Sequence, residues 1–184
     1  MTLSTAAFRR TATVALAALA LAAAAPPAAP AVETGAQRYT ANLVNDDPRQ
    51  GRKIENFEIE IVRLSTPEEL AALANGGAKS AAEVGSAKLE RTMSRSVVAA
   101  IETNGGSGKK LTVVFDKPLN WFDASRNPSA KKFPYGVVEI ELDGQGKGQG
   151  KLIAGAQVKF GANGVEIADA AGEPMRIVNV ATRG

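Results

Sequence analysis

The side chains available for chemistry are restricted, because the 184-residue chain contains neither histidine nor cysteine. It therefore lacks the usual general base at neutral pH and every imidazole or thiolate ligand for a metal ion. These absences exclude zinc hydrolysis, Ser-His-Asp catalysis and Cys-His catalysis. We predict no catalytic residue, no metal site and no cofactor.

Two pairs of glutamates, Glu58 with Glu60 and Glu139 with Glu141, are each separated by one residue in strand-like segments. Residues two apart share a face of a strand and lie about 7 Å apart, within the range of glycosidase carboxylates. Any strand with a solvated face produces the same pattern. We interpret both pairs as solvated and keep a carboxylate-based hydrolase using Glu139 and Glu141 as the least favoured hypothesis.

Two glycine-rich stretches, 104–109 and 144–151, do not fit known phosphate-binding loops. Neither contains G-x-x-x-x-G-K-[ST], and neither places G-x-G-x-x-G between a strand and a helix. Asp143 precedes the second stretch, but the further Asp or Asn ligands of a calcium loop are missing. We interpret both stretches as flexible hairpin loops.

The segment 117–135 (KPLNWFDASRNPSAKKFPY) is long for a connection within a compact domain, and such connections are often functional. Its aromatic and cationic side chains could bind a sugar, a lipid head group or an acidic polymer. The candidate ligand-binding residues are therefore Trp121, Phe122, Arg126, Lys131, Lys132, Phe133 and Tyr135. The alternative, favoured by the small number of aromatics, is that Trp121 and Phe122 belong to the core.

The elements that must position these residues are mostly strands, because apolar residues recur at every second position. The clearest strand is 53–64, in which Phe57, Ile59 and Ile61 alternate with Glu58 and Glu60. The same reasoning predicts strands over 38–45, 95–104, 111–115, 137–142, 152–160 and 174–182, and a hairpin partner after residue 164. In the 95–104 strand, Val97, Ala99 and Ile101 are expected on one face.

Helical signals occur only between the second and third of these strands. Ser65 and Glu68 predict a capping box that opens a short helix, which ends at 75–77 (NGG). A second box from Ser80 to Glu83 predicts another helix that continues to about Arg91 and is weakened by Gly85. About eight short strands with one helical insertion predict a mainly β fold, either an antiparallel β-barrel, which we prefer, or a β-sandwich.

The glycine-rich stretch also sets the pairing of the strands on either side. A tight Asp143-Gly144 turn would place a polar row opposite a buried one. A five-residue loop pairs Ile140 with Gly150 instead, and we prefer this register.

A second hairpin is predicted at Asn163-Gly164, because a type I′ turn requires positive φ at both positions. A two-residue turn there would place Phe160 opposite Ile167, so that apolar side chains meet.

The N-terminus carries the pattern of a removable secretory signal. Arg9 and Arg10 precede an uncharged stretch over 11–25, which is shorter than the roughly 20 apolar residues of a membrane span. Ala29-Pro30-Ala31 is the best cleavage site, so we place the cut between Ala31 and Val32. The predicted organisation is a signal peptide (1–31), a flexible leader (32–37) and a single β-rich domain (38–184), with an uncleaved anchor as the alternative.

Removal of this signal changes what the composition implies. The 22 Lys and Arg residues lose Arg9 and Arg10 while all 19 acidic residues remain, so the formal charge falls to about +1. A nearly neutral domain without a clustered basic stripe does not favour nucleic acid as a partner. No later stretch is apolar and long enough to span a membrane. An exported chain without disulfides must be stabilised by its core, as is common in the bacterial envelope.

Several short motifs occur together in the C-terminal part of the chain: FDKPL at 115–119, WF at 121–122, FPY at 133–135, Glu139, LD at 142–143, GKGQGK at 146–151 and EPMR at 173–176. With this set, the chain from about Gln37 onward resembles a family of small exported bacterial proteins of unknown function. The resemblance supports the β-rich fold and implies no activity, ligand or catalytic residue.

These observations lead to three functional hypotheses. The first is a non-catalytic, secreted or periplasmic β-domain that binds a small-molecule or polymeric ligand, with 117–135 as its site. The second is a structural or assembly component of the cell envelope that has a protein partner. The third is the hydrolase based on Glu139 and Glu141.

Overall fold

The computed structural model describes residues 35–47, 51–76, 84–89, 93–105, 108–119, 132–162 and 164–183. These residues form nine strands and one helix. Their bounds are β1 Gln37–Asp47, β2 Gly51–Ile61, α1 Pro67–Ala74, β3 Gly85–Leu89, β4 Met93–Asn104, β5 Lys109–Phe115, β6 Tyr135–Leu142, β7 Lys147–Gly161, β8 Gly164–Ala171 and β9 Met175–Arg183.

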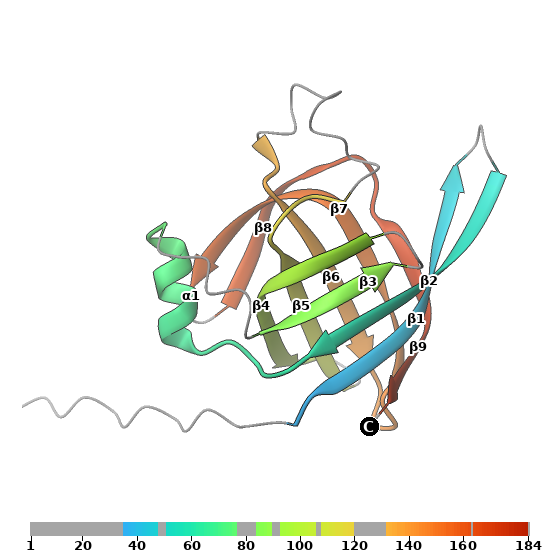
Figure 1. The fold of residues 1–184 in the computed structure, drawn as a ribbon, viewed down its shortest axis with the longest axis horizontal. Helices are drawn as coiled ribbons and strands as arrows, with labels where there is room; N and C mark the ends of the chain where they lie inside the picture. The colour runs from blue at the N-terminus through green and yellow to red at the C-terminus, as the bar shows by residue number, and fades with distance from the viewer. Residues whose placement is uncertain are drawn as a thin grey trace, which may run out of the picture. The chain divides into compact units, whose positions relative to one another are not determined.

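Eight of the strands close into an antiparallel barrel, with the order β6-β5-β4-β3-β2-β1-β9-β7 and a final pairing of β7 with β6. The ninth strand, β8, pairs with the second half of the long strand β7, beyond the part that pairs with β9. β7 therefore belongs to the barrel at its start and to a two-stranded extension at its end (Figure 1). The prediction of a mainly β, antiparallel barrel is confirmed, and the sandwich alternative is wrong.

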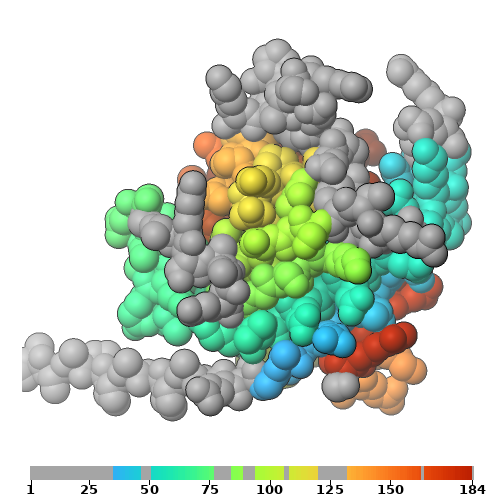
Figure 2. Space-filling view, in the orientation of Figure 1, coloured from blue at the N-terminus to red at the C-terminus, as the bar shows by residue number. Residues whose placement is uncertain are grey.

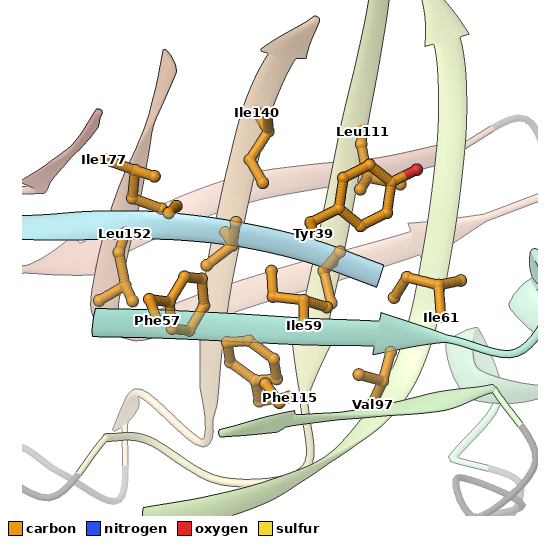
Figure 3. Close-up of a cluster of buried hydrophobic side chains, with 14 of the residues drawn as sticks. Tyr39, Phe57, Ile59, Ile61, Val97, Leu111, Phe115, Ile140, Leu152 and Ile177 are labelled. Carbon is orange, nitrogen blue, oxygen red and sulfur yellow. The ribbon is translucent and has the colours of Figure 1, made fainter. Parts of the chain in front are cut away.

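The interior of the barrel is filled by apolar side chains. The predicted alternation in β2 is confirmed, because Phe57, Ile59 and Ile61 are buried inside the barrel while Glu58 is exposed. Figure 3 shows inward side chains from several strands that point toward one another and meet in the middle. The inward side chains shown there are almost inaccessible to solvent: Tyr39, Phe57, Ile59, Ile61, Val97, Leu111, Phe115, Ile140, Leu152 and Ile177.

A second, smaller core lies on the outside of the barrel wall. There α1 packs against β7 and β8, and Leu70 of the helix is buried with Val114, Val137 and Ile153. Tyr135 and Phe160 add an edge-to-face ring pair whose centroids are 5.4 Å apart. In the space-filling view, α1 lies at one side of the barrel (Figure 2). The eight-residue helix is the only one in the described ranges, and nothing helical there has the length and apolar character that crossing a membrane requires.

The helix α1 begins one residue later than the sequence indicates. Thr66, and not Ser65, is the N-cap: its side chain accepts a hydrogen bond from the Glu69 amide, and the Glu69 side chain accepts one from the Thr66 amide. The capping box is therefore Thr66–Glu69, because the Ser65 hydroxyl instead accepts a hydrogen bond from the Ala100 amide of β4. The helix ends at Asn75 and Gly76, as predicted.

The predicted second helix is wrong for residues 85–89, which form strand β3 between β2 and β4. Ala87 points into the barrel, while Ser86 and Lys88 face solvent. The strand has only five residues, so its alternation is a weak signal in the sequence, and the capping pattern upstream favours a helix instead. In the sequence Gly85 only weakens the predicted helix, but in the strand it has a steric role. A β-carbon at this position would collide with the Glu60 carbonyl oxygen of β2. Residues 80–83 and 90–91 lie outside the described residues.

A β-bulge in β4 overturns the expectation that Val97, Ala99 and Ile101 share a face. Val97 pairs with Phe115 and Ala99 with Val114, so β4 contains one extra residue at this point. Val97 therefore points into the barrel, whereas Ala99 and Ile101 join the outer core. A bulge of this kind reverses the facing of all later residues in the strand.

The two predicted hairpins have different outcomes. The five-residue loop is confirmed, because Ile140 pairs with Gly150 and the last pair, Leu142 with Gly148, encloses residues 143–147. Residues 147–151, however, belong to β7 and not to a flexible loop.

The predicted register of the second hairpin is wrong by two residues. Phe160 pairs with Val165 and Gly161 with Gly164, so Gly164 belongs to β8 and not to the turn. A shift of two residues preserves the facing of every side chain, and Phe160 still meets an apolar residue.

Candidate functional site

A shallow groove lined mainly by polar side chains lies on the outside of the barrel, across β5, β6, β7 and β9. Its volume is about 390 Å³. Its lining combines charged and polar residues with small or apolar ones: Lys110, Glu139, Glu141, Gln149, Gly150, Lys151, Arg176, Ile177 and Val178. We refer to this site as the outer groove.

Strand alternation explains why the polar residues of the outer groove share a face. On β6, Ile140 points into the barrel, so Glu139 and Glu141 point outward. On β7, Lys151 lies directly opposite Glu139, and Gln149 lies directly opposite Glu141. Lys151 is also paired in register with Arg176 of β9. The groove is therefore built from cross-strand neighbours, the side chains of which meet on one face of a sheet.

The glycines of β7 occupy the inward positions between these polar residues. Gly150 lies between the inward residues Ile140 of β6 and Ile177 of β9. A β-carbon at Gly150 would collide with the carbonyl oxygen of Glu139. Glycine thus lets β7 approach β6 closely and leaves room for both isoleucines, while its neighbours Gln149 and Lys151 face outward.

Glu139 lies between two ammonium groups. Lys110 Nζ is 2.6 Å from its Oε1 atom, and Lys151 Nζ is 2.7 Å from its Oε2 atom. The Glu139 side chain is only 13% exposed. Partial burial alone would raise the pKa of this carboxyl, but the hydrogen bonds and charges of Lys110 and Lys151 bring the pKa below its ordinary value. Glu139 is therefore held as a carboxylate.

Arg176 forms the opposite side of the outer groove. Its Nη2 atom lies 2.6 Å from Asp46 Oδ2, which fixes the guanidinium near the end of β1. Arg52 Nε approaches the other Asp46 oxygen at 3.7 Å. Both arginines are largely exposed, so the guanidinium of Arg176 remains accessible from solvent.

This arrangement suits ion binding and hydrogen bonding better than acid catalysis. A glycosidase acid requires a pKa raised toward neutrality. The pKa of Glu139 is moved in the opposite direction by two cations. In the second glutamate pair, Glu60 contacts Arg38 at 3.3 Å, and Glu58 lines a separate polar groove with Lys88.

Most of the candidate ligand-binding residues in 117–135 lie outside the described residues: Trp121, Phe122, Arg126 and Lys131, as do the cleavage residues Ala31 and Val32. Lys132 is exposed, and its Nζ atom lies 2.6 Å from Asp169 Oδ2. Phe133 is buried, with the Lys132 ammonium 5.3 Å from its ring centroid. Tyr135 is half-buried against Phe160. The two described aromatic residues of the segment therefore pack within the protein.

Sequence reasoning identified Glu139 and Glu141 but missed the basic side of the outer groove: Lys110, Lys151 and Arg176. A usable signal was present, since residues 144–151 alternate glycine with Gln or Lys without exception. In a strand this pattern places every side chain on one face and leaves the other face empty.

Within the described ranges, no group of three Asp, Glu, His or Cys side chains comes together in a way that could hold a metal ion. The site therefore has to be interpreted from its charges and hydrogen-bonding groups. No family model matches the chain, and no curated protein or solved structure is significantly similar to it.

Proposed function

We propose that this chain is an exported, non-catalytic binding domain of the bacterial periplasm or exterior, whose ligand binds on the outside of the barrel. The observation that carries this proposal is the outer groove, in which a partly buried carboxylate holds two ammonium groups at fixed positions beside an exposed arginine. The volume of the groove is within the range of small-ligand sites, and its converging polar groups would orient a ligand.

The packing of the barrel interior supports an external site. Small barrels either fill their interior with side chains or enclose a ligand. Here the inward side chains Ile59, Val113 and Val138 have no exposed surface, and their neighbours are equally well packed. A ligand would have to displace this core, whereas the outer groove is open to solvent.

Export is supported by the N-terminal pattern of paired arginines, a short uncharged stretch and an A-x-A site. The absence of catalytic activity is supported by the missing His and Cys and by the ionised state of Glu139. The ammonium groups that lower its pKa would oppose its protonation during a catalytic cycle.

Native mass spectrometry of the protein purified from its own secretion route tests the proposal. We expect a mature chain that begins at Val32 and carries a ligand, and we expect Lys110→Gln/Lys151→Gln to lose that ligand. The double variant Lys53→Gln/Lys159→Gln removes two lysines elsewhere and should retain it. A wild-type protein without ligand, or a ligand that survives loss of Lys110 and Lys151, would contradict the proposed site.

The segment 117–135 is a second candidate location for the same function. If it binds the ligand, Trp121→Ala abolishes binding and leaves the fold intact, as circular dichroism would report. If Trp121→Ala unfolds the protein, Trp121 is a core residue and this location is wrong.

A structural or assembly role in the envelope is the alternative function, and the position of β8 favours it. Among the described strands, β8 pairs with β7 alone, and one of its edges has no neighbouring strand. A sheet edge of this kind can accept a strand from another protein. A protein that is monomeric in sedimentation and recovers no partner from envelope fractions would contradict this role.

A further inference from the structure

The charges of the outer groove are arranged by depth. The Glu139 side chain is 13% exposed, whereas Lys151 is 50% and Arg176 is 61% exposed. The carboxylate is thus the inner group and the cationic ends are the outer groups. Glu139 is the least exposed of these groups, so an approaching anion would first contact the two ammonium groups and the Arg176 guanidinium, which is paired with Asp46, beside the exposed Glu141.

The two ammonium groups retain hydrogen-bonding capacity. An ammonium group has three donors, and Glu139 accepts one from Lys110 and one from Lys151. Because both lysines contact the same carboxylate, their Nζ atoms are held on either side of it. An anionic group placed over Glu139 could accept hydrogen bonds from both lysines, and Arg176 lies next to Lys151 in register.

The composition of the groove argues against several ligand classes. Its lining contains no aromatic side chain, so it offers no platform on which a nucleobase or a sugar ring could stack. It also lacks Trp and Tyr, two of the three residue types enriched among the anchors of protein–protein contacts. Affinity must therefore come from ion pairs and hydrogen bonds.

A second row of polar groups lies beside the cations. Glu141 and Gln149 face each other across β6 and β7, two residues along the strands from the Glu139–Lys151 pair. Two residues correspond to about 7 Å, roughly the span of one pyranose ring with its substituents. Glu141 accepts hydrogen bonds, and Gln149 both donates and accepts them, which suits hydroxyl groups.

We propose that the outer groove binds an acidic saccharide. The carboxylate of a uronic acid lies between Lys110 and Lys151 with Arg176 beside it, and hydroxyl groups of the sugar contact Glu141 and Gln149. This inference rests on the proposed binding function and names its ligand class.

Isothermal titration of the mature protein with trigalacturonate, and with its fully methyl-esterified form, tests the proposal. The two ligands share their ring hydroxyls and differ in charge. We expect only the acid to bind, and we expect Lys151→Gln to weaken binding by about tenfold or more, the loss typical of one hydrogen bond to a charged group. Lys159→Gln, which removes an exposed lysine of β7 outside the groove, should leave the affinity unchanged.

A further variant tests the effect of the Glu141 charge on binding. Glu141→Gln keeps a hydrogen-bond acceptor and removes a negative charge, so it should bind trigalacturonate at least as tightly as the wild type. Circular dichroism of each variant separates lost binding from lost folding.

Three results would overturn the saccharide proposal. They are equal binding of the methyl ester, binding of inorganic phosphate but not of trigalacturonate, and binding that Lys151→Gln does not weaken. If native mass spectrometry still finds a ligand that depends on Lys110 and Lys151, the proposed binding function stands and only the ligand class is wrong. If no ligand is retained and no probe binds, both proposals fail.

Discussion

At the scale of single residues, Glu139 combines partial burial with contacts to two ammonium groups. Both contacts require the ionised carboxylate, and they bring its pKa below the ordinary value despite burial. A group whose pKa is lower in the folded than in the unfolded state adds stability above its unfolded pKa. That stability is lost as the pH falls through the folded pKa.

The pH dependence of unfolding tests this account of Glu139. We expect Glu139→Gln to lower the free energy of unfolding at pH 7 by about 1–2 kcal/mol, because it leaves Lys110 and Lys151 facing each other without a counter-charge. The difference from wild type should shrink as the pH falls below the ordinary pKa of a glutamate and through the lowered pKa of folded Glu139, because the wild-type carboxyl then also becomes protonated. Urea unfolding at several pH values measures this difference in the free energy of unfolding.

Glu58→Gln, at an exposed position of β2, is the control, and it should change the free energy of unfolding little at any pH. A pH-independent difference for Glu139→Gln would show that shape, and not charge, causes the loss.

The glycines of β7 act at the same scale through space and not through charge. Gly150→Ala adds a β-carbon that would collide with the Glu139 carbonyl oxygen between β6 and β7. We expect a loss of about 1–3 kcal/mol in the free energy of unfolding, as for overpacked interiors. Gly144→Ala is the matched control, because nothing lies within 4 Å of its added β-carbon. Equal stability of the two variants in urea would contradict the close approach of β7 to β6.

At the scale of elements, α1 is fixed at its start by the reciprocal hydrogen bonds of Thr66 and Glu69. Glu69 also accepts two hydrogen bonds from Arg63, with N–O distances of 2.8 and 2.6 Å. We expect Thr66→Ala to cost about 1 kcal/mol of stability and Thr66→Ser to restore most of it, because serine retains the capping hydroxyl. Chemical unfolding of the three proteins provides the measurement. A Thr66→Ser protein as unstable as Thr66→Ala would mean that the methyl group, and not the cap, matters.

The elements also show where sequence reasoning succeeds. Strand β2 follows its period without interruption, so Phe57, Ile59 and Ile61 are correctly assigned to the interior. In β4 the alternation of inward and outward side chains reverses after Val97, because a β-bulge there places one extra β4 residue opposite β5. Nothing local distinguishes Ala99 from Val97, so this change of face could not be predicted.

The outer groove was only half predictable for a related reason. Glu139 and Glu141 share a face by simple alternation, which the sequence contains. The predicted five-residue loop already places Lys151 opposite Glu139, whereas Lys110 comes from β5, whose pairing with β6 spans a long connection that no local signal in the sequence fixes. A carboxylate pair that resembles a catalytic site in the sequence is therefore an ion-paired site in the structure.

At the scale of the whole molecule, the described chain has two cores that share the barrel wall. The inner core fills the closed barrel, and the outer core lies beneath α1 and the β7–β8 extension. Strands of the barrel have neighbours on both sides, whereas β8 pairs only with β7 among the described strands. We therefore expect the extension and helix to open at a lower free energy than the barrel.

Native-state hydrogen exchange of two core variants tests this difference. Ile140→Ala removes an inward side chain with no exposed surface, and we expect it to lower the protection of the slowest amides in every barrel strand by about 2–5 kcal/mol. Phe160→Ala removes one ring of the Tyr135–Phe160 pair in the outer core. We expect it to speed exchange in β8, α1 and the end of β7, while the slowest amides of β1 and β2 keep their wild-type rates. If Phe160→Ala lowers protection in β2 as much as in β8, the two cores unfold as one unit, and α1 with β8 is as integral to the fold as the barrel.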